Sequence, residues 1–130
     1  VRNHPMLGDF PHENFCDLQF YRMIAEFPPI DLRPFGDLKE EPVIRSFSTC
    51  FRMYPLAYLI EFSWGKGHII ITSLNFDQNL PEARYLFTQM LKYLENAKLP
   101  ENKLNDVVVD RLIEESSEKI DIFGSLKLKE

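Results

Sequence analysis

Hydrophobic and polar positions along the chain follow two periods, and the helical period occurs in three segments. Residues 15–27 place apolar side chains three and four positions apart, which predicts a short helix capped by Asn14. Residues 106–117 carry a second, shorter stripe of the same kind. The most regular pattern spans residues 81–96, with an apolar face formed by Ala83, Leu86, Phe87, Met90, Leu91 and Leu94. We expect this last segment to be the main helix, with that face buried.

A period of two, typical of strands, occupies the middle of the chain. It predicts a strand around residues 30–32, another over 42–51, and a pair over 56–64 and 68–74. The residues 65–67 between the last two are Gly, Lys and Gly, which favour the tight turn of a hairpin. Strict alternation in the first hairpin strand would give one face to Leu56, Tyr58, Ile60, Phe62 and Trp64.

Three consecutive isoleucines, residues 69–71, indicate a strand that is buried on both faces. Helices must then lie above and below it, so the chain is predicted to be α/β: a small open mixed sheet of about three to five strands, flanked by helices. An α+β arrangement is the alternative. We expect residues 1–97 to form the domain and residues 98–130, a helix and a tail, to pack on it. Within the tail, residues 120–128 fit a strand or a frayed end.

Composition narrows the class of protein. The chain has 130 residues, of which 45% are hydrophobic and 27% charged, as expected for one globular domain or a piece of one. Its formal net charge of −5 argues against a nucleic-acid partner. No apolar run reaches the roughly 20 residues that span a bilayer. The start resembles neither a signal peptide nor an initiation site, which fits an excised fragment; a processed end is the alternative, and the compartment is left open.

The cysteines and the glycine-rich turn offer little catalytic chemistry. Cys16 and Cys50 could form one disulfide, but two separate buried thiols are favoured. Neither lies in the glycine-flanked elbow of a nucleophile. The turn at residues 65–67 lacks the further glycine and the Ser or Thr of a phosphate loop. We therefore expect neither a catalytic cysteine nor a phosphate site.

Acidic and histidine side chains also lack a functional spacing. His4, His12, Glu13 and Asp17 are near one another in the sequence but match no metal-binding motif, so ordinary loop polarity is favoured and no metal or cofactor is expected. A glycosidase carboxylate pair could be imagined from Asp17, Glu61 and Glu82. Glu61 in a strand and Glu82 in a first helical turn both have structural explanations, and no catalytic residue is assigned.

Aromatic side chains are the remaining candidates for binding. Aromatic faces pack against the apolar faces of sugars, and Phe20, Tyr21, Trp64 and Tyr85 could contact a sugar or a neighbouring domain. Placement in the core is the alternative for residues of this type. An exposed row of Trp64, Phe20 and Tyr21 would favour sugar binding.

Four segments together resemble the C-terminal region of bacterial glycoside hydrolase family 2 proteins, the β-galactosidase-like group. They are Asn3-His4-Pro5 with Phe10-Pro11, Cys16-Asp17-Leu18-Gln19-Phe20-Tyr21, the stretch from Phe62 and Gly65-Lys66-Gly67-His68 to Leu74, and Pro81-Glu82-Ala83-Arg84. The similarity covers roughly residues 3–95. Family members usually carry tryptophans after the Gln, where this chain has Phe20 and Tyr21.

The resemblance implies a non-catalytic accessory module, similar to a class I glutamine amidotransferase-like domain with a partial flavodoxin-like sheet. The family's catalytic glutamates lie in a (β/α)₈ barrel of at least about 200 residues, which cannot fit in this chain. The implied role is as a scaffold or in oligomerisation in a carbohydrate-degrading enzyme. A carbohydrate-binding module and an independent amidotransferase-like enzyme are the alternatives. Implied partners are the other domains of a periplasmic or secreted parent glycosidase, with carbohydrate or a second copy as further candidates.

Overall fold

The computed structural model describes residues 1–47 and 54–114. The elements within these ranges are η1 (Pro5–Leu7), α1 (Leu18–Ile24), β1 (Ile30–Asp31), η2 (Arg33–Phe35), β2 (Ile44–Phe47), β3 (Pro55–Trp64), β4 (Gly67–Thr72) and α2 (Pro81–Asn96). Residues 106–114 are also helical. The predicted tail segment 120–128 and Cys50 lie outside the described residues.

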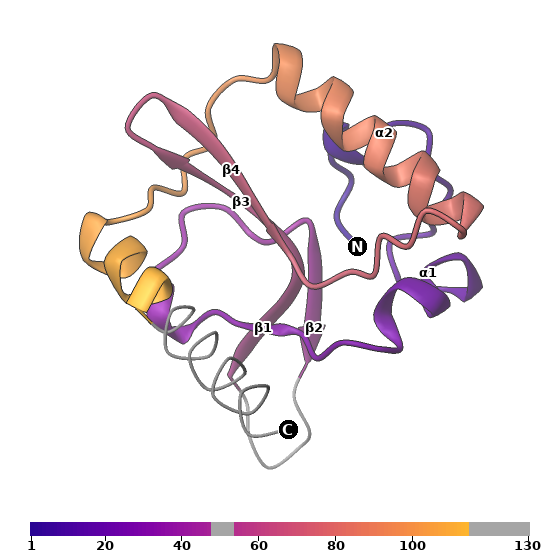
Figure 1. Cartoon of the computed structure of the whole chain (residues 1–130), viewed down its shortest axis with the longest axis horizontal. Helices are drawn as coiled ribbons and strands as arrows, with labels where there is room; N and C mark the ends of the chain where they lie inside the picture. Colours follow the sequence, from indigo (N-terminus) through magenta and orange to yellow (C-terminus); the bar gives the residue numbers. More distant parts are fainter. Residues whose placement is uncertain (48–53, 115–130) are drawn as a thin grey trace, which may run out of the picture.

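The long strand β3 organises the sheet (Figure 1). Its first half lies between β1 and β2, and its second half forms a hairpin with β4. All three neighbours run antiparallel to β3. Ser63 on β3 also forms an isolated parallel bridge with Lys103. The four strands form a small open sheet flanked by helices, which confirms the predicted α/β arrangement.

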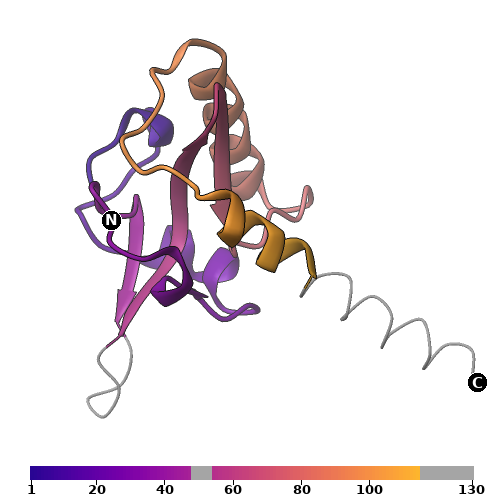
Figure 2. The same ribbon diagram turned by 90° about the vertical axis from the view of Figure 1, so that its left-hand side faces the viewer.

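The sheet separates two apolar clusters, and the helices cover opposite faces (Figures 1 and 2). On one face, η1, α1 and α2 pack over Leu59, and the cluster includes Met6, Phe20 and Leu86. On the other face, Ile60 and Phe62 pack against Leu32, Leu104 and the helical residues 106–114. Ile70 contributes to the first cluster, whereas Ile69 and Ile71 contribute to the second, so the isoleucine run serves both faces as predicted.

The hairpin turn forms where the glycines predict it. Gly65 has a φ of 59°, a left-handed value at the first of the two turn residues, as in a type II′ turn. A side chain at this position would have open space around it, so the backbone conformation alone favours glycine there.

Two details of the elements differ from the sequence prediction. Ile44 pairs with Leu59 but Arg45 pairs with Ala57, so β3 carries an extra residue, Tyr58, opposite β2. Such a bulge breaks strict alternation, because Tyr58 now packs against the first cluster while Ile60 and Phe62 join the second. The predicted single face of β3 was therefore wrong.

The predicted cap of the first helix was also wrong. The side chain of Asp17 accepts the amide hydrogen of Leu18 and caps α1. Asn14 has a φ of 69° and lies in the preceding turn, before the helix begins. Asp17 is the cap because its extended backbone places its short carboxylate where it can accept a hydrogen bond from an otherwise unpaired amide at the helix start.

The strands predicted at 30–32, 56–64 and 68–74 correspond to β1, β3 and β4, and α2 spans the predicted 81–96. The part of the 42–51 strand that lies within the described residues is β2. None of the helices in the described ranges has the length and apolar character needed to cross a membrane.

Candidate functional site

The chemically distinctive position is Glu61, a carboxylate in the middle of the buried half of β3. Its neighbours in the strand are Ile60 and Phe62, and Glu61 itself is only 3% exposed. A buried carboxylate must be paired or hydrogen-bonded, because an isolated charge is strongly disfavoured in an apolar interior. The partners of Glu61 therefore determine what this position does.

Three side chains from three other parts of the chain meet Glu61. His4, just before η1, places its Nε2 2.7 Å from Glu61 Oε1. His68, on β4, places its Nε2 2.8 Å from Glu61 Oε2. The hydroxyl of Tyr93, from α2, donates to the same Oε2 at 2.8 Å. We call His4, Glu61, His68 and Tyr93 the Glu61 cluster.

Local structure explains how the cluster assembles. On the hairpin, Glu61 is directly opposite Ile70, so His68 lies on the same face two residues along. Tyr93 lies on the inner side of α2, and both imidazole rings meet its ring edge-on, with centroids at 5.2 Å from His4 and 5.6 Å from His68. The cluster thus joins the N-terminal segment, the hairpin and the main helix at one point.

The hydrogen bonds of His4 define its tautomer. Its Nδ1 accepts the amide hydrogen of Met6 at 3.1 Å, so in the neutral ring the proton is on Nε2, which donates to Glu61. Protonation of Nδ1 would break the bond to Met6. The neutral Nε2–H form of His4 therefore satisfies both its backbone and its carboxylate partner.

Electrostatics at Glu61 reflect two opposing effects. Burial favours the neutral acid and would raise the pKa of Glu61, but the hydrogen bonds from His4, Tyr93 and His68 stabilise the carboxylate and lower the pKa to about 2. Burial and the hydrogen bond to Glu61 both raise the pKa of Tyr93, so its hydroxyl stays protonated as a donor. The cluster is an ionised carboxylate held by three donors.

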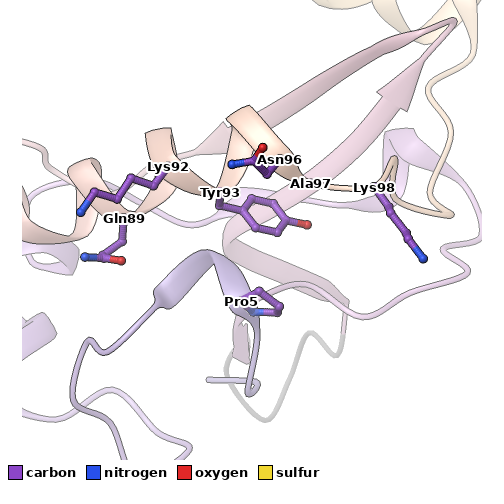
Figure 3. A pocket seen from close by; sticks show the side chains of 7 residues that line it. All are labelled: Pro5, Gln89, Lys92, Tyr93, Asn96, Ala97 and Lys98. Atoms are coloured by element: carbon purple, nitrogen blue, oxygen red, sulfur yellow. The ribbon is translucent and has the colours of Figure 1, made fainter.

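A groove of about 540 Å³ lies beside the cluster, between η1 and the end of α2 (Figure 3). Its lining residues are Pro5, Gln89, Lys92, Tyr93, Asn96, Ala97 and Lys98. The hydroxyl of Tyr93 is already bonded to Glu61. Of the other polar lining residues, Lys92, Asn96 and Lys98 are exposed and Gln89 is partly buried, so the groove presents no fully buried polar side chain to a ligand.

This arrangement is suited to holding parts of the chain together. Oε1 of Glu61 contacts His4 and Oε2 contacts both His68 and Tyr93, so the buried carboxylate bonds mainly within the chain itself. Within the ranges 1–47 and 54–114, no three His, Cys, Asp or Glu side chains are arranged to hold a metal ion. The Glu61 cluster is therefore best described as a buried polar lock.

A second buried polar residue, Asn102, joins separate segments at the edge of β3 that does not pair with β4. Its side-chain oxygen accepts the amide hydrogens of Lys39 and Glu40 at 2.7 and 2.9 Å, and its amide group donates to the carbonyl of Glu40 at 2.9 Å. Its backbone carbonyl accepts the amide hydrogen of Ser63 at 2.7 Å. These bonds attach the segment after α2 both to β3 and to the loop before β2.

The aromatic residues proposed for sugar or interface contact lie in different places. Phe20 is fully buried and packs against Phe10, so it belongs to the core. Tyr21 on α1, Trp64 at the hairpin turn and Tyr85 on α2 are exposed. The hairpin turn and α1 lie at opposite ends of the molecule (Figure 1), so these exposed rings form no common row.

The cysteine and histidine candidates are similarly separated. Cys16 is a free, half-buried thiol, and burial raises its pKa, the opposite of what activates a nucleophile. His68 is engaged with Glu61, and His12 accepts the amide hydrogen of Asn14. Because Cys50 lies outside the described residues, only Cys16 can be compared with an amidotransferase nucleophile, and its environment does not match one.

Reasoning from the sequence alone missed the Glu61 cluster. The available signal was a charged residue inside the apolar run Leu59-Ile60-Glu61-Phe62, where a buried strand has no solvent for a carboxylate. That signal predicts a buried partner but does not say which residue provides it.

Comparison with known proteins places the chain in a family. A model of the family described as "Domain of unknown function (DUF8487)" matches residues 1–114. The chain belongs to this family. No curated protein matches it.

Proposed function

We propose that this chain is a non-catalytic accessory domain of a glycoside hydrolase family 2-type glycosidase, with a scaffold or oligomerisation role. The observation that carries the proposal is that its distinctive polar site, the Glu61 cluster, is closed by the chain's own donors. A buried site of this kind is suited to fixing the relative positions of elements. The parent's catalytic carboxylates would lie in another domain.

The segments that resemble family 2 proteins support this proposal by where they meet. His4 comes from the first of them, and His68 follows the glycine turn of another. Pro81 and Glu82 begin α2, the helix that supplies Tyr93. The matching segments thus contain two of the four cluster residues and the start of the helix that supplies a third, which is the pattern expected when a shared fold, and not a shared reaction, accounts for the resemblance.

Exposed apolar side chains support a role in assembly. Large apolar residues that face solvent occur on both helical layers, among them Phe87, Leu91 and Leu94 on α2 and Val107 and Ile113 on the other face. Surface of this kind, repeated on several elements, is typical of a domain that packs against other protein.

The test uses the full-length protein that contains this chain. We expect it to hydrolyse aryl glycosides, and we expect a version lacking residues 1–130 to retain turnover per folded active site while losing oligomer size or thermal stability. The chain alone should not hydrolyse the same substrates. A full-length protein without glycosidase activity, or a chain that is active alone, would contradict the proposal.

Carbohydrate binding is the second candidate, and Trp64 is the residue that favours it. Its ring is 45% exposed, and its indole N–H donates to Asp106 at 2.8 Å, which fixes the orientation of the ring. Calorimetric titration with plant and host-glycan oligosaccharides separates the two functions. Saturable binding that is lost in Trp64→Ala would replace the scaffold role with a binding role, whereas a folded chain that binds none of the sugars supports the scaffold.

A further inference from the structure

The outer edge of β4 is open for strand pairing. β4 pairs with β3 along one edge, and no strand in the described part of the chain pairs with the other. Proteins usually block a free edge with charged residues, proline or a bulge. β4 contains no Asp, Glu, Lys, Arg or Pro, and its pairing with β3 shows no bulge. Its centre is the isoleucine run 69–71. This edge is therefore built to accept another strand.

The α2 layer extends apolar surface past this edge. Tyr93 contacts Glu61 on β3 and His68 on β4, so α2 lies above the β3–β4 pair. The flank of α2 that carries Gln89 and Tyr93 faces η1. On the opposite flank, at helical spacing, are Phe87, Leu91 and Leu94, which are 39%, 49% and 37% exposed. We call these three residues the α2 stripe. It lies on the side of α2 away from η1, and its Phe87 contacts Phe76 in the segment that follows β4.

The other layer also presents apolar surface along β4. A groove of about 330 Å³ separates β4 from the helical residues 106–114. Ile69 and Ile71 form one wall, and Leu112 and Ile113 form the other, with Ile113 58% exposed. The open strand is thus bordered by partly exposed apolar side chains above and below, as at the interrupted edge of a larger core.

We propose that a second copy of this chain occupies the edge, with the two β4 strands antiparallel about a two-fold axis perpendicular to the sheet. The strand fits its own copy because it places uncharged isoleucines opposite one another. The same axis brings the two α2 stripes face to face. The inference deepens the oligomerisation role of the proposed function and rests on it.

The spacing of the layers agrees with this arrangement. Paired strands are about 4.8 Å apart. If the axis of α2 lies midway above β3 and β4, it is about 2.4 Å from β4, measured toward β3. Two copies joined at β4 would then place their α2 axes roughly 10 Å apart. Packed helices are separated by about 8–10 Å. At that distance the two α2 stripes would be close enough to pack against each other.

The experiment is sedimentation velocity and equilibrium on the 130-residue chain from about 1 to about 100 μM, the range in which micromolar dimers dissociate. We expect a reversible dimer of the 15.3 kDa chain. Leu91→Glu, which places a charge in the α2 stripe, should raise the dimer Kd at least about tenfold. Thr88→Glu adds the same charge to an exposed position outside the stripe and should leave the Kd within about twofold.

Hydrogen exchange keeps the proposal testable if Leu91→Glu does not fold. In the wild-type chain, the outward-facing amides of β4 should become more protected as concentration rises, while those of β1 should not change. A chain that is monomeric throughout overturns the dimer, as does a dimer insensitive to Leu91→Glu with unprotected β4 amides. Protection of β4 only within a monomeric full-length protein also overturns it, in favour of a strand from elsewhere in the parent. The glycosidase assay above decides the accessory role independently.

Discussion

Replacing Glu61 with Gln removes the charge at the centre of the polar lock while nearly preserving its shape. In the folded chain the pKa of Glu61 is lowered from 4.5 to about 2 by its hydrogen bonds. At about 1.4 kcal/mol per unit, this difference stabilises the folded state by about 3 kcal/mol when the carboxylate is ionised in both states. Glu61→Gln should therefore lower the free energy of unfolding at pH 7 by about 3 kcal/mol.

The sign of the pH dependence follows from the lowered pKa. A carboxylate with a lower pKa in the folded state contributes its full stabilisation above the unfolded value of 4.5 and loses it as the pH falls toward 2. The difference between wild type and Glu61→Gln should shrink from about 3 kcal/mol at pH 7 to roughly 1.5 kcal/mol at pH 3. Carboxylates outside the Glu61 cluster are unchanged between the two proteins, so the difference reports on the cluster.

Urea unfolding followed by far-UV circular dichroism at pH 7, 5, 4 and 3 measures this difference. Glu95→Gln is the matched control, because Glu95 is exposed on α2, and it should change the free energy of unfolding by less than about 0.5 kcal/mol. A gap of the same size at every pH, or a loss below about 1 kcal/mol at pH 7, would refute the assignment of Glu61 as a stabilised buried carboxylate.

Three further changes test the lock, the hairpin and the attachment of the segment after α2. Tyr93→Phe removes one donor to a charged acceptor and should lower the free energy of unfolding by about 1.5–3 kcal/mol in urea titration. Gly65→Ala should cost about 1 kcal/mol by the same measurement because its φ is positive, whereas Lys66→Ala should cost almost nothing. Asn102→Ala leaves buried groups unpaired and should lower the free energy of unfolding by about 2–3 kcal/mol, which thermal unfolding detects as a lower midpoint. Asn96→Ala, at the exposed end of α2, should not change the midpoint.

The elements that could be predicted from the sequence are those fixed by neighbouring residues. Pro81 and Glu82 suit a helix start, and the apolar spacing that follows continues to Asn96, so α2 has the predicted bounds. Gly65 similarly marks the hairpin because the turn needs its positive φ. Signals of this kind act within one or two turns of the chain and do not depend on the rest of the fold.

The site could not be predicted, because it depends on contacts between distant segments. His4 lies in a proline-punctuated segment with no periodicity, and its position over β3 is fixed by the packing of η1 against α2. The bulge at Tyr58 arises from the register of β2 on β3, which neither strand encodes alone. Likewise, only half of the apolar face of α2 is buried, since Phe87, Leu91 and Leu94 are exposed.

Two buried polar residues, Glu61 and Asn102, explain why the N-terminal segment and the segment after α2 pack on one sheet. An apolar contact between the N-terminal segment and β3 would tolerate several registers, whereas Glu61 requires donors at fixed positions and is costly to bury without them. Asn102 imposes the same requirement on the segment after α2, through the amides of Lys39 and Glu40. Glu61 thus joins the N-terminal segment and α2 to β3 and β4 on one face of the sheet, and Asn102 joins the segment after α2 to the edge of β3 that does not pair with β4. If these contacts hold the β3–β4 pair in place, its outer edge would lose little conformational entropy on pairing with another strand.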